Sequence, residues 1–287
     1  MSARPATRRD LSGSTAAMAN RRPKLSDGQV WQKLELFPTP PWATRALFEH
    51  VLPTLHVGRI GPVWDPCAGL GHMSEVLKEY SDDVRASDKH IYDLADGGSM
   101  ISEVEPRDLL EADSDLLCAT RFVVFNPPFR PAADMVRRIL KHGRGVAVLL
   151  RLQWLESRDR YALFSELPPS RVAVFSERVG MCEGGWDPDL KSATGYAWFV
   201  WVRNPYTGEW AAPTRHAAGA FDGMLIPYGC KKALTRESDR ALARRCVPGF
   251  VPPTLLRKRA NLAALHAVEG PQTATVLRAD GARAVVV

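Results

Sequence analysis

The stretch VWDPCAGLGHMSEVL, residues 63–77, decides the fold. Its first three residues predict a short buried strand that ends in an acid, and the apolar spacing after Gly71 predicts a helix. The turn between them contains Gly69 and Gly71. Glycine lets a backbone approach a ligand closely, and the first N–H groups of a helix have no partner within it. The stretch therefore predicts a strand, a ligand-facing turn and a helix.

The same alternation of short apolar runs and amphipathic stretches continues over residues 60–203. Continuous apolar runs such as VVF and VAVLL are typical of parallel strands that are covered on both faces. We therefore expect an α/β domain with a doubly wound, mostly parallel sheet. The expected strands are 62–65, 84–88, 122–125, 145–150, 172–175 and 196–202, and the expected helices are 73–80, 132–141 and 158–166.

A second acid follows the glycine turn at the distance that a ribose-binding residue requires. The strand VRASD, residues 84–88, ends in Asp88, which lies about twenty residues after the glycines. An acid at this strand end can accept hydrogen bonds from ribose hydroxyls. The turn lacks the G-x-G-x-x-G order of dinucleotide sites, and Asp65 would repel a pyrophosphate. A cationic ligand with a ribose suits these residues better than NAD.

A third strand, FVVF at 122–125, ends in Asn126, Pro127, Pro128 and Phe129. Ligand crevices of open α/β sheets lie at the carboxyl ends of their strands. The tetrapeptide brings an amide, two rigid prolines and an aromatic ring to such an end. In isolation it would be a stiff loop with a core phenylalanine, but it follows the glycine turn by about sixty residues.

Together these motifs resemble those of S-adenosylmethionine-dependent amino-methyltransferases of nucleic acids. DPCAGLG is similar to their D-P-x-x-G-x-G turn, and NPPF is similar to their (D/N/S)-P-P-(Y/F) signature, in which Asn with Phe occurs in adenine N6 enzymes. The order of PTP, then the glycine turn, then NPPF resembles the γ arrangement of DNA enzymes, of a phage, prophage or orphan type. The resemblance spans residues 37–203 and implies a Rossmann-like class I methyltransferase fold with a seven-stranded sheet.

The resemblance also implies roles for individual residues. Asn126, Pro127, Pro128 and Phe129 would be catalytic. Asp108, in PRDLLEA, would lie near the adenine of the cofactor, with Glu111 and Asp113 as alternatives and a plain surface acid equally compatible with the sequence. The residues expected to bind S-adenosylmethionine are Pro38, Thr39, Asp65, Pro66, Ala68, Gly69, Gly71, Asp88, Asp108 and Asn126.

The chemistry accounts for the residue types of NPPF. An exocyclic aromatic amine is a poor nucleophile because its lone pair is delocalised, so its hydrogens must be drawn toward acceptors while it is held in line. Asn126 Oδ1 and the Pro127 carbonyl are suitable acceptors, and Phe129 would stack on the base. Ahead of the sheet, FPTPPWATRALFEHVL at 37–52 predicts a helix with Thr39 as N-cap and Pro40 in its first turn.

The basic C-terminal region suggests contact with nucleic acid. SDRALARRC at 238–246 and PPTLLRKRANLAALH at 252–266 resemble a helix-turn-helix, and Asp280-Gly281 between apolar runs predicts a hairpin that would form a wing. A helical cap with a solvated basic face is the alternative. The candidate phosphate contacts are Arg244, Arg245, Arg257, Lys258 and Arg259.

Composition sets further limits. The net charge of +6 favours a polyanionic partner such as DNA. No apolar run reaches the roughly 20 residues that span a bilayer, so we expect no membrane insertion and a cytoplasmic location. The 5 cysteines have no metal-ligand spacing, so we expect neither a metal nor disulfides. Residues 1–24 are expected to form a disordered basic tail, 25–204 the catalytic domain and 205–287 the C-terminal appendage.

We therefore predict a DNA adenine-N6 methyltransferase that extrudes its target base. No long insert is present that would serve as a target recognition domain, so short-site or loose specificity is expected. Three alternatives stay open: methylation of an RNA base at guanine N2 or adenine N6, methylation of a protein glutamine, and a DNA-binding regulator with a cofactor-sensing core.

Overall fold

The computed structural model describes residues 35–57, 60–96, 104–204, 207–211, 217–269, 274–277 and 283–286. The predicted tail at 1–24 lies outside these residues. The chain divides into two compact units, of which the first ends at Phe250 and the second begins at Val251. No helix among the described residues is long and apolar enough to cross a membrane.

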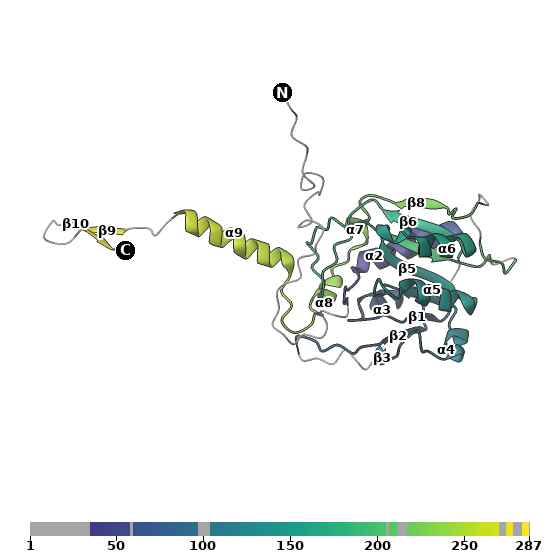
Figure 1. The fold of residues 1–287 in the computed structure, drawn as a ribbon. Coiled ribbons are helices and arrows are strands. Elements are labelled where there is room, and N and C mark those ends of the chain that lie inside the picture. The colour runs from purple at the N-terminus through teal and green to yellow at the C-terminus, as the bar shows by residue number, and fades with distance from the viewer. Residues whose placement is uncertain are drawn as a thin grey trace, which may run out of the picture. The chain divides into compact units, whose positions relative to one another are not determined.

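The first unit is built on one mixed sheet of 8 strands in the order β3-β2-β1-β4-β5-β7-β6-β8 (Figure 1). Only β7 runs antiparallel to its neighbours β5 and β6, while the other neighbours pair in parallel. The strands are β1 (Val63–Asp65), β2 (Val84–Asp88), β3 (Val104–Pro106), β4 (Phe122–Phe125), β5 (Gly145–Arg151), β6 (Arg171–Phe175), β7 (Tyr196–Trp201) and β8 (Gly223–Ile226). The predicted α/β class and mostly parallel sheet are confirmed.

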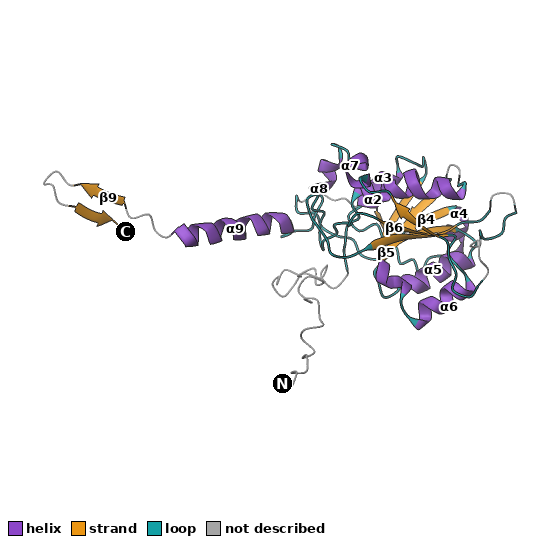
Figure 2. Ribbon diagram, turned by 90° about the horizontal axis from the view of Figure 1, so that it is seen from above, coloured by secondary structure: helices purple, strands orange, loops and turns teal. Residues whose placement is uncertain are grey.

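Helices cover both faces of this sheet. Figure 2 shows α2, α3 and α7 on one side and α5 and α6 on the other. Within the described residues, the helices of the first unit are α2 (Pro41–Ala46), α3 (His72–Leu77), α4 (Ser114–Ala119), α5 (Ala132–Lys141), α6 (Arg158–Glu166), α7 (Cys230–Leu234) and α8 (Asp239–Ala243). Short non-α helical turns follow α2 at Leu47–Val51 and Leu52–Leu55, and follow β5 at Leu152–Leu155.

The two faces of the sheet carry two separate hydrophobic cores. Successive side chains of a strand point to opposite faces. Phe122 and Val124 of β4 therefore pack with Trp42 on the α2 side, whereas Val123 and Phe125 pack on the α5 side. All four β4 residues are buried. This explains why β4 reads as a continuous apolar run, and it fixes the strand end that carries Asn126.

A buried ion network joins α8 to the body of the first unit. The Arg45 Nη2 atom lies 2.7 Å from Glu79 Oε1 and 2.7 Å from Asp239 Oδ1, and both Arg45 and Asp239 are almost fully buried. Arg45 Nη1 also donates to the Leu234 carbonyl. A buried charge is stable only when it is paired and hydrogen-bonded, so these contacts tie α2, α7 and α8 together.

Several details differ from the expectations. The sheet has 8 strands rather than seven, because residues 223–226 add β8 at the edge beside β6. The first unit consequently continues to Phe250 rather than ending near residue 204. Pro40, not Thr39, is the N-cap of α2, and it makes no side-chain cap. Thr39 Oγ1 instead accepts a hydrogen bond from Asn126.

The second unit consists of α9 (Pro253–Glu269) and the strands β9 (Ala274–Leu277) and β10 (Arg283–Val286). β9 and β10 pair antiparallel, with Leu277 opposite Arg283, on the two sides of the predicted Asp280-Gly281 turn. The turn residues lie outside the described part of the chain. The two helices of the expected helix-turn-helix therefore belong to different units, since α8 is part of the first.

Candidate active site

The glycine turn after β1 has the backbone shape that only glycine adopts without strain. Gly69 and Gly71 have φ angles of +52° and +75°. A Cβ atom on Gly69 would lie 2.8 Å from Leu36 Cδ1, so Leu36 would have to move, in addition to the strain that the positive φ imposes on other residues. Gly71 is the N-cap of α3. The turn therefore presents bare backbone at the carboxyl end of the sheet.

Asp88 at the end of β2 is linked to this turn. Its Oδ2 atom accepts a hydrogen bond of 2.9 Å from Gly69 N–H, and its Oδ1 atom accepts one of 2.9 Å from His90 N–H. The side chain is 9% exposed, and burial raises the pKa of the carboxyl group. Each carboxylate oxygen can accept a second hydrogen bond, so Asp88 keeps capacity for a ligand.

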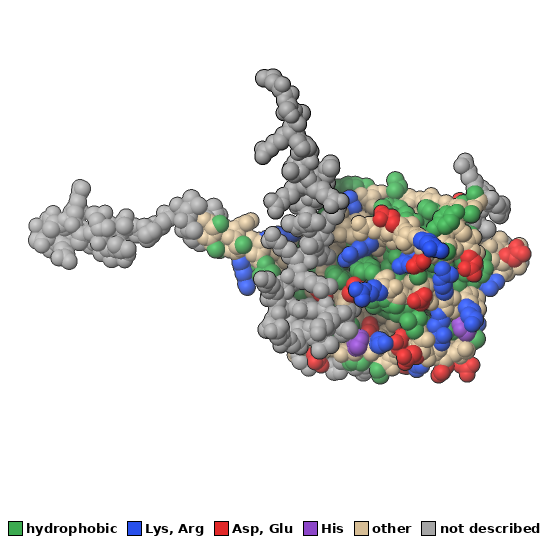
Figure 3. Space-filling model, in the orientation of Figure 1, with side chains coloured by type: hydrophobic (Ala, Val, Ile, Leu, Met, Phe, Trp, Pro, Cys, Tyr) green, Lys and Arg blue, Asp and Glu red, His purple; other side chains and the backbone are tan. Residues whose placement is uncertain are grey.

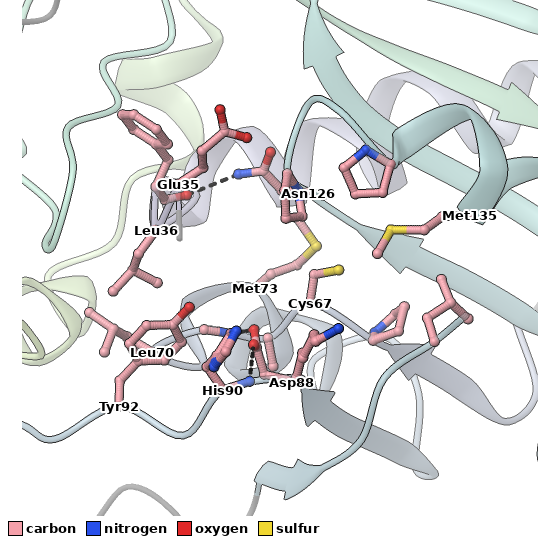
Figure 4. Close-up of a pocket in the computed structure, with 18 of the residues that line it drawn as sticks. Glu35, Leu36, Cys67, Leu70, Met73, Asp88, His90, Tyr92, Asn126 and Met135 are labelled. Carbon is pink, nitrogen blue, oxygen red and sulfur yellow. Dashed lines mark hydrogen bonds between the residues drawn. The ribbon is translucent and has the colours of Figure 1, made fainter. Parts of the chain in front are cut away.

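A cavity of about 560 Å³ lies between these elements, within the size range of small-molecule sites. Asn126 lies on one side of it, Asp88, His90 and Tyr92 lie on the other, and Cys67 lies between them (Figure 4). The sequence-predicted residues that line the cavity are Pro38, Thr39, Pro66, Ala68, Gly69, Asp88, Asp108, Asn126 and Pro128. One cavity thus brings the ends of β1, β2 and β4 together with the PTP segment.

Asn126 is held with its amide nitrogen turned toward the PTP segment. Its Nδ2 atom donates to the Phe37 carbonyl at 2.9 Å and to Thr39 Oγ1 at 3.1 Å, and Met181 Sδ is 3.8 Å away. Among the described residues no donor reaches Oδ1. These contacts fix the side chain and leave an acceptor at the cavity wall.

Phe129 has neighbours that the sequence pattern does not predict. Its N–H donates to Glu35 Oε2 at 2.9 Å, and the Arg151 guanidinium lies 4.1 Å from its ring centroid. The Phe37 ring centroid is 6.3 Å away. Arg151 is the last residue of β5, and β5 pairs with β4. The order of the strands alone therefore predicts that Arg151 lies next to the end of β4. Phe129 itself does not line the cavity, and neither does Pro127.

Asp108 forms an ion pair at the cavity wall. Its Oδ2 atom lies 2.7 Å from Lys89 Nζ, and its Oδ1 atom accepts a hydrogen bond from Leu110 N–H. Although partial burial acts against it, the contacts with Lys89 and Leu110 lower the pKa of Asp108. Glu111 and Asp113, the alternatives to Asp108 near the cofactor adenine, do not line the cavity.

Asp65 lies beneath the turn rather than on the cavity wall. It is fully buried, with Oδ2 accepting from Ser74 Oγ at 2.7 Å and Oδ1 accepting from Cys67 N–H at 3.3 Å. Burial raises the pKa of Asp65 to about 7, although both hydrogen bonds favour the charged form. Gly71 is likewise behind the wall. The carboxyl group therefore supports the turn and is poised to change charge near neutral pH.

This pKa predicts how stability depends on pH. The unfolded carboxyl has a pKa of about 4, so the unfolded chain loses its proton first as pH rises, and the wild type becomes less stable up to about pH 7. Asp65→Asn removes this titration. We expect the free energy of urea unfolding, wild type minus variant, to fall by roughly 2–3 kcal/mol from about pH 5 to about pH 8. A difference that stays flat over this range would contradict the burial argument.

The basic residues of the C-terminal region fall into two groups. Arg244 is exposed, whereas Arg245 is half-buried with its Nη1 atom 3.5 Å from Glu75 Oε1. Arg257, Lys258 and Arg259 of α9 are exposed, as are all described side chains from 255 to 264. Arg245 is therefore the least available of the five predicted phosphate contacts.

Comparison with models of known protein families gives no match, and no curated protein matches either. Among solved structures, the chain is similar to a protein described as a candidate RNA methyltransferase from Pyrococcus horikoshii, with 14% identity over 61% of this chain and 90% of that one and a TM-score of 0.39. It is also similar to the methyltransferase subunit of a type I restriction-modification system from Streptococcus thermophilus, with 11% identity over 80% and 54% and a TM-score of 0.40.

A DrdV–DNA complex matches with 13% identity over 72% of this chain and 30% of that one, at a TM-score of 0.42. This chain thus spans about half the length of the restriction-modification subunit and under a third of the length of the DrdV chain. The fold assignment rests on the order and register of this chain's own strands.

Proposed function

We propose that this chain transfers a methyl group from S-adenosylmethionine to the exocyclic amino nitrogen of a nucleic-acid base, with adenine N6 in DNA as the target. One observation carries the proposal. The Asn126 amide is anchored through Nδ2 to Phe37 and Thr39, while Oδ1 remains at the wall of the cavity that also contains Gly69 and Asp88. The order of strands in the sheet agrees with the class I methyltransferase fold that the motifs resemble.

The residues of the cavity fit this cofactor. Asp88 would accept hydrogen bonds from the ribose hydroxyls, and the bare backbone at Gly69 would let the ligand lie against the turn. Pro38 and Thr39 would hold the methionine end, and Asp108 would lie toward the adenine. When bound, the cofactor supplies an electrophilic methyl group on a positively charged sulfur. The buried Asp65 carboxyl beneath the turn favours a positive charge nearby when it is ionised.

The residues at the end of β4 would prepare the amino group. Asn126 Oδ1 and the Pro127 carbonyl would accept its two hydrogens, which draws the nitrogen toward tetrahedral geometry and exposes its lone pair. Anchoring of Nδ2 to Phe37 and Thr39 would keep the amide from turning over, so Oδ1 would stay available as the acceptor. Phe129 would stack on the base with the ring face that Arg151 does not cover.

The preference for DNA rests on charge and on the motif order. Arg257, Lys258 and Arg259 are exposed on α9 and would contact phosphates. Replacing all three with alanine should weaken binding of duplex DNA and lower the slope of log K against log salt by roughly 2–3, with no change in cofactor affinity. Binding assays at several salt concentrations measure this. An unchanged slope would exclude α9 from the interface.

Transfer of isotope-labelled methyl groups tests the proposal as a whole. The protein is incubated with labelled S-adenosylmethionine and, separately, with duplex DNA, RNA or a release-factor-like protein, and the nucleosides or peptides are identified by mass spectrometry. We expect labelled N6-methyladenine from DNA. Label only in RNA or protein would contradict the DNA assignment. Cofactor binding that changes DNA affinity without label in any substrate would favour a regulator and contradict the enzyme.

A further inference from the structure

The end of the sheet opposite the candidate active site carries a row of arginines. Phe122 of β4 pairs with Gly145 of β5, and Val146 of β5 pairs with Trp201 of β7. When these pairings are extended past the strand ends, Arg121 falls opposite Arg144, and Arg144 falls opposite Arg203. The three arginines thus lie side by side just beyond the ends of β4, β5 and β7. Residues that lie directly across from one another share a face of the sheet. Three positive charges are therefore neighbours.

Among the described residues no carboxylate forms an ion pair with these arginines. Like charges opposite one another on adjacent strands are destabilising. The Arg144 Nε atom is buried without a hydrogen-bond partner, which adds the cost of a desolvated donor. A bound anion would neutralise the three positive charges and lower the free energy that is needed to hold them together.

Arg203 is held firmly in this row. Its Nε atom donates to the Gly143 carbonyl at 3.2 Å, its Nη1 atom donates to the Gly208 carbonyl, and its guanidinium lies 4.5 Å from the Trp210 ring centroid. A Cβ atom on Gly143 would lie 2.9 Å from Arg203 Nη2, so the guanidinium packs closely on the turn before β5. Arg203 is exposed, and these contacts orient its guanidinium at the surface.

The arginines line a second cavity of about 270 Å³. Its polar lining consists of Arg121, Arg144, Arg203, His56 and Asn204, and none of the described lining residues is an acid. On the face of the first unit drawn in Figure 3, by contrast, basic and acidic side chains are interspersed. The second cavity is therefore a locally positive hollow in a mixed surface.

We propose that this hollow binds a phosphate group. Guanidinium forks match the oxygens of phosphate and pair with them through charge-assisted hydrogen bonds. Arg121 precedes β4 and Asn126 follows it, so the hollow lies about 16 Å along the strand from the catalytic amide. The phosphate belongs either to a free anion such as inorganic phosphate or a nucleotide, or to the backbone of a nucleic acid.

Paired glutamine variants test the site. Thermal unfolding is measured with increasing inorganic phosphate at constant ionic strength. The three purified proteins are the wild type, the double variant Arg121→Gln/Arg144→Gln and the control Arg158→Gln. Arg158 is exposed on α6 and does not line the hollow. We expect phosphate to raise the Tm of the wild type and the control. For the double variant, the rise in Tm should be at least about tenfold smaller. Without phosphate, the double variant should melt no lower than the wild type, because the repulsion is removed.

A short phosphodiester oligonucleotide distinguishes the two sources. If the double variant binds it less tightly than the control, and phosphate competes with it on the wild type, the backbone is the natural ligand. If only phosphate distinguishes the proteins, the site serves a free anion. Equal phosphate-dependent rises in Tm for wild type and double variant would overturn the proposal. Arg121→Gln alone, at an exposed position, decides the same question should the double variant not fold.

Discussion

Alanine in place of Asn126 is expected to lower the rate of methyl transfer by roughly 10²–10³-fold, as the loss of one positioned polar contact to a transition state does. The variant removes the acceptor at Oδ1 and also leaves the Phe37 carbonyl and Thr39 Oγ1 without their donor. Cofactor affinity should change far less, because Asp88 and the glycine turn are untouched. Single-turnover rates and calorimetric titration with S-adenosylhomocysteine separate the two effects.

Asn126→Asp is the matched control for this loss. The aspartate keeps an oxygen at the cavity wall but gives up the donated hydrogen bond to the Phe37 carbonyl, so we expect an intermediate rate. Equal, severe losses in both variants would indicate that the anchored geometry matters more than the acceptor. Full activity of the alanine variant would remove Asn126 from the mechanism.

Asp88→Ala is expected to weaken binding of the cofactor by roughly 10–150-fold, since a hydrogen bond to a charged group contributes about 1.5–3 kcal/mol. The substitution also frees Gly69 N–H and His90 N–H, which loosens the turn itself. Titration of the purified variant with S-adenosylhomocysteine measures the change.

Asp108→Ala provides the comparison on the same cavity. Asp108 is paired with Lys89 and is only partly buried, so its removal should cost less than about tenfold in affinity. A larger loss for Asp108 than for Asp88 would contradict the assignment of the ribose to Asp88. The thermal stability of each variant checks that the turn remains folded.

Four elements have the bounds that the sequence predicts. Residues 84–88 and 122–125 form strands, and 132–141 and 158–166 form helices, with the bounds expected from their apolar spacing. In β4 and α5 the apolar pattern is matched by burial, since all of β4 and one face of α5 are buried. The convergence of Gly69, Asp88 and Asn126 followed from parallel strands that end at one edge.

The local sequence pattern does not predict features that depend on contacts with residues far away in the chain. β8 is four residues long, only one of which is buried, and it is defined by its pairing with β6 about fifty residues earlier. Thr39 was read as a helix cap because of its local context, yet its hydroxyl accepts from Asn126, 87 residues away. Asp65 has the sequence position of a ligand contact, but the packing of α3 buries it against Ser74.

A crystal structure with S-adenosylhomocysteine bound tests the central claim most directly. The account predicts the ribose hydroxyls within hydrogen-bond distance of the Asp88 carboxylate and the sulfur facing Asn126 Oδ1 across one shared cavity. A ligand bound outside this cavity, or a sulfur turned away from the end of β4, would contradict it.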